Sequence, residues 1–266
     1  MEAYQDFAYV YDELMDDTPY KEWCERLVKL IERYGVSKPG GSGKDALESE
    51  RDLVVDLGCG TGTLTELLYK KGYDMIGVDN SESMLGVAME KREESGAQIL
   101  YLLQDMRELE LYCTVGTVIS VCDSLNYILK EEELLKVFSL VNNYLYPGGI
   151  FIFDFNTEYK YREVIGDTVI AENREDCSFI WENTYYYETE LNEYNVTVFV
   201  QEQEDLFRRF TETHWQRGYR VEQMKRLVQQ AGMELVAILD ADTGEDVRPE
   251  SERVYFVVRE RGKRDV

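Results

Sequence analysis

The chain of 266 residues lacks the features that mark several classes of protein. It has no run of 18 consecutive apolar residues, and its start, MEAYQD, lacks the basic segment and apolar centre of a secretory signal. Its five cysteines are odd in number and include no CxxC pair, which supports neither a disulfide framework nor a zinc site. We therefore expect a cytoplasmic protein with free thiols, no membrane segment and no metal site.

Basic residues are also scarce. The chain has 29 lysines and arginines against 53 aspartates and glutamates, for a net charge of −24. A field of this sign repels a phosphate polymer unless a local basic patch overcomes it, and the short clusters Lys70-Lys71 and Arg259 to Arg264 do not form one. We expect no nucleic-acid partner, and a substrate that is neutral or cationic.

The most informative stretch is DLVVDLGCGTGT, at residues 52–63. Residues 54–57 read as a short buried strand, Gly58, Gly60 and Gly62 permit positive φ, and residues 63–70 (TLTELLYK) have a helical pattern. A helix N-terminus that follows a glycine turn presents backbone amides to a ligand. Strand, turn and helix therefore predict a nucleotide-type cofactor loop.

Two ligands compete for such a loop, a dinucleotide pyrophosphate and S-adenosylmethionine. A dinucleotide loop has the spacing GxGxxG, whereas this chain has Gly58-x-Gly60-x-Gly62 with Asp56 ahead of it. An acidic Asp56 disfavours an anion and favours the ammonium group of an amino-acid tail. The spacing therefore favours S-adenosylmethionine, with an NAD-dependent oxidoreductase as the alternative.

At this point the chain resembles the class I S-adenosylmethionine-dependent methyltransferases, whose first motif is D/E-x-G-x-G-x-G. The resemblance implies a Rossmann-like α/β fold, with a seven-stranded, mostly parallel sheet and helices on both faces. It also implies that the residues of the loop, Cys59 among them, contact the cofactor. A catalytic role for Cys59 is not supported, since a glycine turn requires a small residue there for any chemistry.

The following segments match the same family in order. A second strand ends at Asp79, about 20 residues past the glycines, where the family places the carboxylate that binds the ribose hydroxyls. Ser81 is a candidate N-cap for the next helix, and Asn80, Ser81 and Met84 are expected on the adenosine side. After a third strand, Asp105 and Met106 match the family's adenine-binding pair.

A fourth strand begins at residue 117 and runs into Cys122, Asp123 and Tyr127, at the expected switch point of the sheet. The resemblance places this edge beneath the transferred methyl group. Cys122 and Asp123 are therefore included among the cofactor-binding residues. A Pro-Gly-Gly turn and a fifth strand follow, ending at Asn156.

The rest of the chain divides into four predicted regions. Residues 1–34 form an N-terminal helical lid with Tyr4 and Tyr11, and residues 35–50 a flexible connector, since they are polar and glycine-rich. Residues 51–156 and 215–266 make the core. Residues 157–214 alternate like strands and predict an inserted antiparallel sheet, either a substrate cap or an oligomer interface.

Methyl transfer requires alignment of donor and acceptor and removal of a proton, with no obligatory nucleophile. Candidates for the base are Asp123, Tyr127 and the only histidine, His214. Candidates for contacts with the acceptor are, besides the lid tyrosines, Asn126, Arg217 and Tyr219. We expect transfer to nitrogen or oxygen of a small molecule, and a homodimer is possible. A cofactor-binding scaffold without activity is a further alternative.

Overall fold

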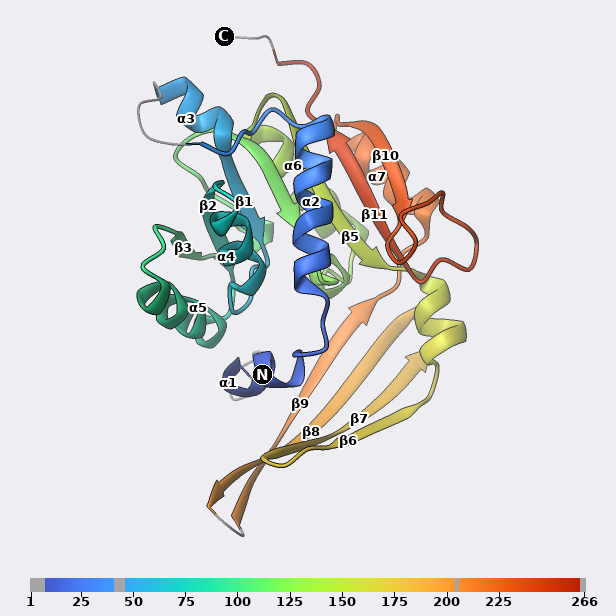
Figure 1. The fold of residues 1–266 in the computed structure, drawn as a ribbon. Coiled ribbons are helices and arrows are strands. Elements are labelled where there is room, and N and C mark those ends of the chain that lie inside the picture. The colour runs from blue at the N-terminus through green and yellow to red at the C-terminus, as the bar shows by residue number, and fades with distance from the viewer. Residues whose placement is uncertain (1–7, 41–45, 204–205, 264–266) are drawn as a thin grey trace.

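The computed structural model describes residues 8–40, 46–203 and 206–263 and contains the predicted seven-stranded sheet (Figure 1). Its strand order is β10-β11-β5-β4-β1-β2-β3. All strands are parallel except β11, which runs antiparallel to both neighbours. In chain order the strands are β1 (Leu53–Leu57), β2 (Asp74–Asp79), β3 (Leu100–Leu103), β4 (Val115–Ser120), β5 (Leu145–Asn156), β10 (Glu234–Asp240) and β11 (Arg253–Arg259).

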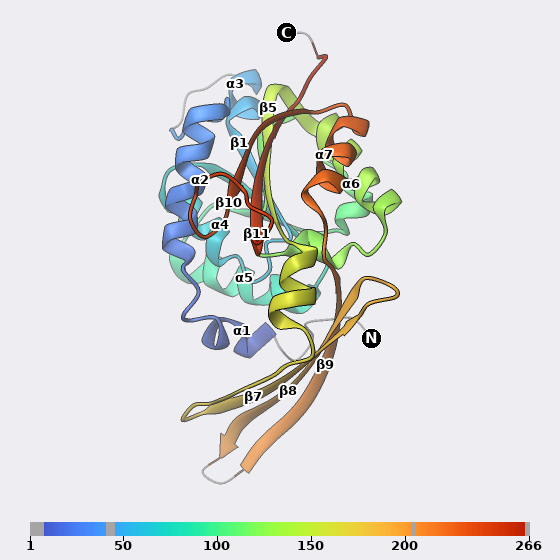
Figure 2. The ribbon, with the colours of Figure 1, turned by 90° about the vertical axis from the view of Figure 1, so that its right-hand side faces the viewer.

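Helices cover both faces of this sheet, as the edge-on view shows (Figure 2). One face carries α2 (Tyr20–Tyr34), α4 (Thr63–Lys70) and α5 (Glu82–Ser95), and the other carries α6 (Glu131–Tyr144) and α7 (Val221–Gln230). The Rossmann-like fold that the sequence predicts is thus confirmed. Within the described ranges, no helix is both long and apolar enough to cross a membrane.

The sheet has two cores because its side chains alternate between its faces. In β5, Phe151, Phe153 and Phe155 pack towards α6 and α7, whereas Ile150 and Ile152 pack towards α2. All five are fully buried. A strand covered on both sides reads as a continuous apolar run, and this is the pattern by which β5 is recognisable in the sequence.

One local prediction needs correction, and one helix was not predicted. The connector expected at 35–50 is helical in its last part, because α3 (Ala46–Asp52) leads directly into β1. The sequence pattern did not lead us to expect α6 either, although three glutamates at its first turn suit a helix N-terminus. A short π-helix, Lys160–Ile165, then connects β5 to the insertion.

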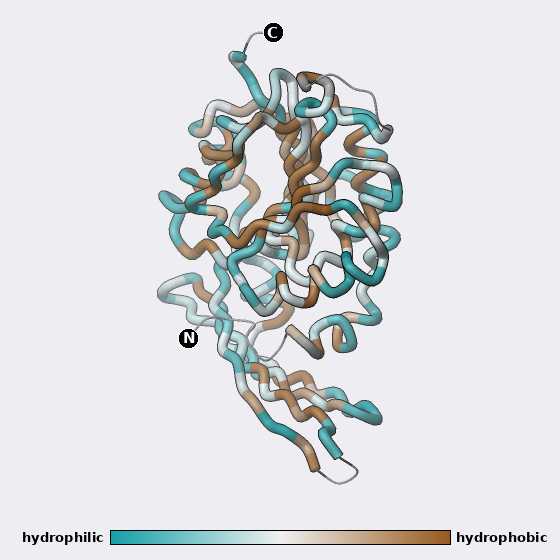
Figure 3. Tube along the Cα trace, turned by 90° about the vertical axis from the view of Figure 1, so that its left-hand side faces the viewer, coloured by the Kyte–Doolittle hydropathy of each residue, from teal (hydrophilic) through white to brown (hydrophobic). Residues whose placement is uncertain are grey.

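The insertion is a four-stranded antiparallel sheet that extends away from the core (Figure 1), as predicted. Its strands are β6 (Val169–Asn173), β7 (Cys177–Tyr186), β8 (Leu191–Gln203) and β9 (Leu206–Arg217), so it runs past the expected boundary at 214. Apolar segments gather in the core strands and recur along this sheet (Figure 3). Helix α1 (Ala8–Leu14) lies near the turn between β6 and β7, where Asp16, just after the helix, pairs with Arg174 at 3.0 Å.

Candidate active site

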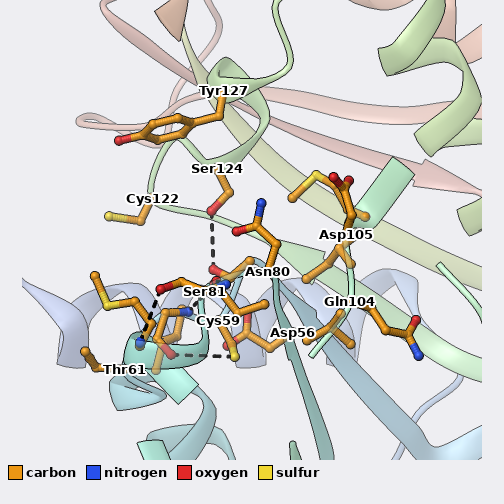
Figure 4. Close-up of a pocket in the computed structure, with 18 of the residues that line it drawn as sticks. Asp56, Cys59, Thr61, Asn80, Ser81, Gln104, Asp105, Cys122, Ser124 and Tyr127 are labelled. Carbon is orange, nitrogen blue, oxygen red and sulfur yellow. Dashed lines mark hydrogen bonds between the residues drawn. The ribbon is translucent and has the colours of Figure 1, made fainter. Parts of the chain in front are cut away.

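A cavity of about 910 Å³ opens at the carboxyl ends of β1, β2, β3 and β4 (Figure 4). Ligands of open α/β sheets bind in the crevice outside these strand ends. Most residues that the sequence assigns to the cofactor line this cavity, namely Asp56, Gly58, Cys59, Gly60, Asp79, Asn80, Ser81, Met84, Asp105, Met106 and Cys122. Segments far apart in the chain thus meet at one edge of the sheet.

The loop between β1 and α4 adopts left-handed backbone conformations. The φ angle is 83° at Gly58, 53° at Gly60 and 73° at Gly62. A Cβ at Gly58 would lie 2.6 Å from Ser124 Oγ, and one at Gly62 would collide with the Tyr101 hydroxyl. At Gly60 a Cβ would meet nothing within 4 Å. Gly58 and Gly62 are therefore required for close packing, whereas the backbone at Gly60 is open towards the cavity.

Asp79 ends β2 and connects it to the glycine loop. Its Oδ2 accepts a hydrogen bond from the Gly60 amide and its Oδ1 one from the Ser81 amide, both at 2.8 Å. Burial raises the pKa of Asp79, although these two amides and that of Asn80 act in the opposite direction. A carboxylate has about four lone-pair sites, so Asp79 can still accept a hydrogen bond from a ligand.

Asp56, in β1, is a buried acid on the cavity wall. Its Oδ2 accepts a hydrogen bond from Thr65 Oγ1 at 2.6 Å. Burial raises the pKa of Asp56 to about 7, a trend that the Thr65 hydrogen bond opposes and the Asp79 charge reinforces. A cationic group in the cavity would stabilise the ionised form of this carboxyl.

Two side chains organise the wall beyond β2 and β3. Ser81 is the N-cap of α5, as predicted, and accepts a hydrogen bond from the Met84 amide at 3.3 Å. Asp105 pairs with Arg107, with Nε 2.9 Å from Oδ1 and Nη2 2.5 Å from Oδ2. The guanidinium lowers the pKa of Asp105 and keeps the carboxylate charged.

The cavity also involves residues that the sequence reasoning missed. Thr61 and Thr63 flank Gly62, and Arg107 follows the Asp105-Met106 pair, so a wider reading of each motif would have included them. Tyr20 lies in the predicted lid but was not assigned to the site. Ser124 gave no such signal, since the turn after β4 meets the cavity only through tertiary packing.

The turn after β4 is strained and is held by a buried ion pair. Cys122 and Asp123 have φ of 65° and 55°, an arrangement that costs of order 1–3 kcal/mol per residue without glycine. Asp154 accepts hydrogen bonds from both of their amides, at 3.2 and 3.1 Å. Asp154 is fully buried and pairs with Arg253, whose guanidinium lies 4.1 Å from the Trp23 ring centre. This pair determines where the end of β4 lies.

Asp123 points to the insertion and does not line the cavity. Its Oδ2 accepts hydrogen bonds from Gln216 Nε2 at 2.8 Å and Asn156 Nδ2 at 3.3 Å. Burial raises the pKa of Asp123, and Gln216 and the nearby Lys160 act against this rise. The carboxyl therefore joins the ends of β4, β5 and β9.

Tyr127 lines the cavity and connects it to the insertion. It lies in the 3₁₀ helix η2 (Ser124–Tyr127), and its hydroxyl is 3.2 Å from His214 Nδ1 in β9. His214 is buried and does not itself line the cavity. Its Nε2 lies 3.4 Å from Glu212 Oε2. Two of the three candidates for the base, Tyr127 and His214, are thus in contact.

Three of the predicted acceptor contacts lie behind the cavity wall. Asn126 Nδ2 donates to the backbone oxygens of Asn156, at 2.9 Å, and Arg217, at 2.7 Å. Arg217 Nη1 donates to the Leu129 oxygen at 3.1 Å, and the Tyr219 hydroxyl donates to the Ile128 oxygen. These polar groups hold η2 in place from outside the cavity. We had expected them to contact the acceptor inside it.

The N-terminal region contacts the cavity through α1. Tyr11 lines it and forms side-chain hydrogen bonds with Tyr20 and Cys122, and burial raises the pKa of Tyr11. The next residue, Asp12, accepts hydrogen bonds from Thr61 Oγ1 at 2.7 Å and Thr63 Oγ1 at 3.2 Å, and pairs with Lys91. Tyr4, also predicted in the lid, lies outside the described residues.

Comparisons with known proteins agree with this geometry. The family described as "Methyltransferase domain" matches residues 54–149. A candidate methyltransferase of Geobacillus sp. (strain WCH70) is 34% identical over 257 residues, covering 97% of this chain and 99% of its own. The crystal structure of an S-adenosylmethionine-dependent methyltransferase from Clostridium acetobutylicum superposes with a TM-score of 0.83 at 30% identity, covering 98% and 100% of the two chains. The chain belongs to the class I S-adenosylmethionine-dependent methyltransferases.

The NAD-dependent and scaffold alternatives are therefore wrong: the protein is a methyltransferase and its cofactor is S-adenosylmethionine. CalS10, an amino pentose methyltransferase from Micromonospora echinaspora, shares the fold of this enzyme at 16% identity, with a TM-score of 0.69 over 98% of both chains.

The cavity of the methyltransferase fits this cofactor in two respects. The open backbone at Gly60 allows close approach, and the Asp79 carboxylate, which lines the cavity, can still accept from a ligand hydroxyl. When bound, S-adenosylmethionine supplies a methyl group already activated on a sulfonium.

Proposed function

We propose that this enzyme methylates nitrogen or oxygen of a small-molecule acceptor that is neutral or cationic. In this proposal Asp79 binds the ribose, and Asn80, Ser81, Met84, Asp105 and Met106 surround the adenosine. Asp56 receives the amino-acid tail, and the glycine loop with Cys59 and Cys122 completes the cofactor site. The acceptor enters beside Tyr127 and Tyr11.

The observation that carries the proposal is the way in which β9 meets the edge of the cofactor cavity. His214 and Gln216 lie on one face of this strand and contact Tyr127 and Asp123, just past the end of β4. An inserted sheet that reaches this edge is suited to shape a pocket for a small molecule. It also restricts the space available to a polymer.

Charge favours an amine among the possible acceptors. Asp56, Asp79 and Asp123 are carboxyls in or beside the cavity, and the chain carries a net charge of −24. Such a field raises the encounter rate of cations and lowers that of phosphorylated compounds. The relation to CalS10, which acts on an amino pentose, supports the same class.

The test is a turnover screen of the purified full chain with methyl-labelled S-adenosylmethionine. Small primary and secondary amines, amino sugars, phenols and alcohols are offered in parallel, with protein and RNA as comparison substrates. We expect methylation of an amine or hydroxyl compound, detected as a mass increase of one methylene. The matched control is Asp79→Ala, which should lose turnover at low cofactor concentration. Methylation of only the protein or RNA would contradict the proposal.

A further inference from the structure

Three side chains extend in a line from the cavity wall into the base of the insertion. The Tyr127 hydroxyl is 3.2 Å from His214 Nδ1, and His214 Nε2 is 3.4 Å from Glu212 Oε2. The tyrosine lines the cavity, whereas the side chains of His214 and Glu212 are only 4% and 11% exposed. Binding of the cofactor does not by itself require a histidine and a glutamate next to the Tyr127 hydroxyl.

The register of the insertion produces this line. Glu212 and His214 are two residues apart in β9, so their side chains leave the strand on the same face. Gln216, the next residue on that face, bonds to Asp123 at 2.8 Å and anchors the strand to the end of β4. The contact between Gln216 and Asp123 therefore helps to fix the position of His214 relative to Tyr127.

The chemistry of the partners determines where the imidazole proton lies. A carboxylate only accepts hydrogen bonds, so the nitrogen facing Glu212 is the one that carries the proton. Nδ1 then presents its lone pair to Tyr127, and the phenol donates to it. Catalytic contacts are often longer in the free enzyme than in its substrate complex, which accommodates the 3.4 Å separation.

We propose that Glu212, His214 and Tyr127 form a proton relay that removes the proton of the methyl acceptor. The proposal rests on the function proposed above. As the acceptor nitrogen or oxygen forms its bond to the methyl carbon, the bond between that carbon and sulfur breaks, and the electron pair remains on sulfur. The acceptor proton passes to Tyr127 Oη, and the phenol proton passes to His214 Nδ1. Glu212 balances the charge of the resulting imidazolium. Tyr127 is the catalytic residue, and His214 and Glu212 are positioning residues that act through it.

The alternative is that these three side chains have only a structural role. The rings of Tyr127 and His214 also pack edge to face, with their centroids 5.9 Å apart. The two roles differ in what they require. Packing requires shape, which Tyr127→Phe and His214→Gln largely keep, whereas a relay requires a phenol hydroxyl and an imidazole.

The first experiment needs no acceptor, because His214 is the only histidine in the chain. The full chain is labelled with ¹⁵N-histidine, and the ring nitrogens are observed by NMR with S-adenosylhomocysteine bound. We expect the proton on Nε2, an Nδ1 signal that shifts in Tyr127→Phe, and an Nε2 signal that shifts in Glu212→Gln. A proton on Nδ1, or signals insensitive to both variants, would overturn the relay.

The second experiment measures turnover on an acceptor from the screen. We expect Tyr127→Phe and His214→Gln each to lower kcat by about 100-fold or more, the usual scale for general base catalysis. The affinity for S-adenosylmethionine should stay within about twofold. Because the residues act as a unit, the double variant should be no slower than the slower single variant. The control is Thr213→Ala, whose side chain lies on the opposite face of β9.

The two proposals fail in different ways. Full turnover by Tyr127→Phe, or losses that multiply in the double variant, would overturn the relay and leave the proposed function standing. An enzyme that methylates none of the small molecules would overturn the proposed function, and the histidine signals would still test the arrangement of the three side chains.

Discussion

At the scale of single residues, carboxyl groups at strand ends define the cofactor cavity. Asp56 and Asp79 leave neighbouring parallel strands at the same edge, and both are buried enough for their pKa values to rise. A buried acid gains most from a partner that a ligand brings, since burial disfavours its charged form. Substitutions of these two residues are therefore the most direct tests of the cofactor site.

Replacing Asp79 with alanine should weaken S-adenosylmethionine binding by on the order of 2 kcal/mol or more, about 30-fold in Kd. The reason is the loss of two charge-assisted hydrogen bonds to the ribose. Calorimetric titration measures the effect, with S-adenosylhomocysteine in parallel. Asp74→Ala, at the exposed start of the same strand, is the control and should bind normally. Unchanged affinity in the Asp79 variant would remove this residue from the site.

Asp56 should make the stability of the free enzyme depend on pH. Its folded pKa of about 7 lies above an unfolded value of about 3.9, so the folded chain holds the extra proton between these values. Its contribution to the free energy of unfolding is fully present below about pH 4 and is lost as pH rises through 7. Urea unfolding of wild type and Asp56→Asn at pH 5 and 8 measures it, and the wild-type advantage should fall with pH. An advantage that grows with pH would contradict the raised pKa.

At the scale of elements, two contacts between distant segments shape the cavity. Helix α1 reaches the glycine loop through Asp12, and the turn after β4 depends on Asp154 in β5 and Arg253 in β11. Each contact joins segments that local sequence patterns describe separately. Each can be removed by a single substitution.

Replacing Asp12 with alanine should speed the release of S-adenosylmethionine by about tenfold. The side chain bonds Thr61 and Thr63 and pairs with Lys91, and losing such contacts is worth roughly 1–2 kcal/mol. Stopped-flow displacement by S-adenosylhomocysteine measures the rate. Asp17→Ala, an exposed residue shortly after α1, is the control for the lost charge. Equal release rates would mean that α1 does not retain the cofactor.

Replacing Asp154 with asparagine should lower the free energy of unfolding by about 3–5 kcal/mol, because Arg253 is left with an uncompensated buried charge. The amides of Cys122 and Asp123 also lose an ionised acceptor. Urea unfolding measures the loss, with the exposed Asp242→Asn as its control. A loss below about 1 kcal/mol would show that the ion pair does not support this turn.

At the scale of the whole molecule, the charge imbalance is the dominant property. A net charge of −24 produces self-repulsion that opposes the compact state. The same field favours the neutral or cationic acceptor that we propose. Whether the enzyme is a homodimer stays a prediction that sedimentation of the full chain can check.

Salt should therefore stabilise the enzyme. Raising sodium chloride from about 0.02 to 0.3 M shortens the screening length severalfold and weakens the repulsion, so Tm should rise by a few degrees. Thermal unfolding followed by circular dichroism measures this, with equal osmolality of sucrose as the control for general exclusion effects. A Tm that is constant or falls with salt would show that ion pairs outweigh the net repulsion.

Sequence patterns predicted the core well because they are local. The glycine loop, α4 and the N-cap Ser81 occur where their residue types require them, since φ preference and capping act over a few residues. Asn126, Arg217 and Tyr219 were misplaced because a polar side chain at a strand end can point into a cavity or away from it. Only packing decides between the two.

The sequence by itself determined the order of the strands of the core sheet, the cofactor loop and the presence of an antiparallel insertion. Periodicity and turn chemistry carry that information within each segment. The tertiary structure alone decided that Asp154 and Arg253 hold the turn after β4, and that Tyr127 meets His214. These contacts join residues far apart in the chain, and the path of the chain through the sheet, which no local pattern contains, brings them together.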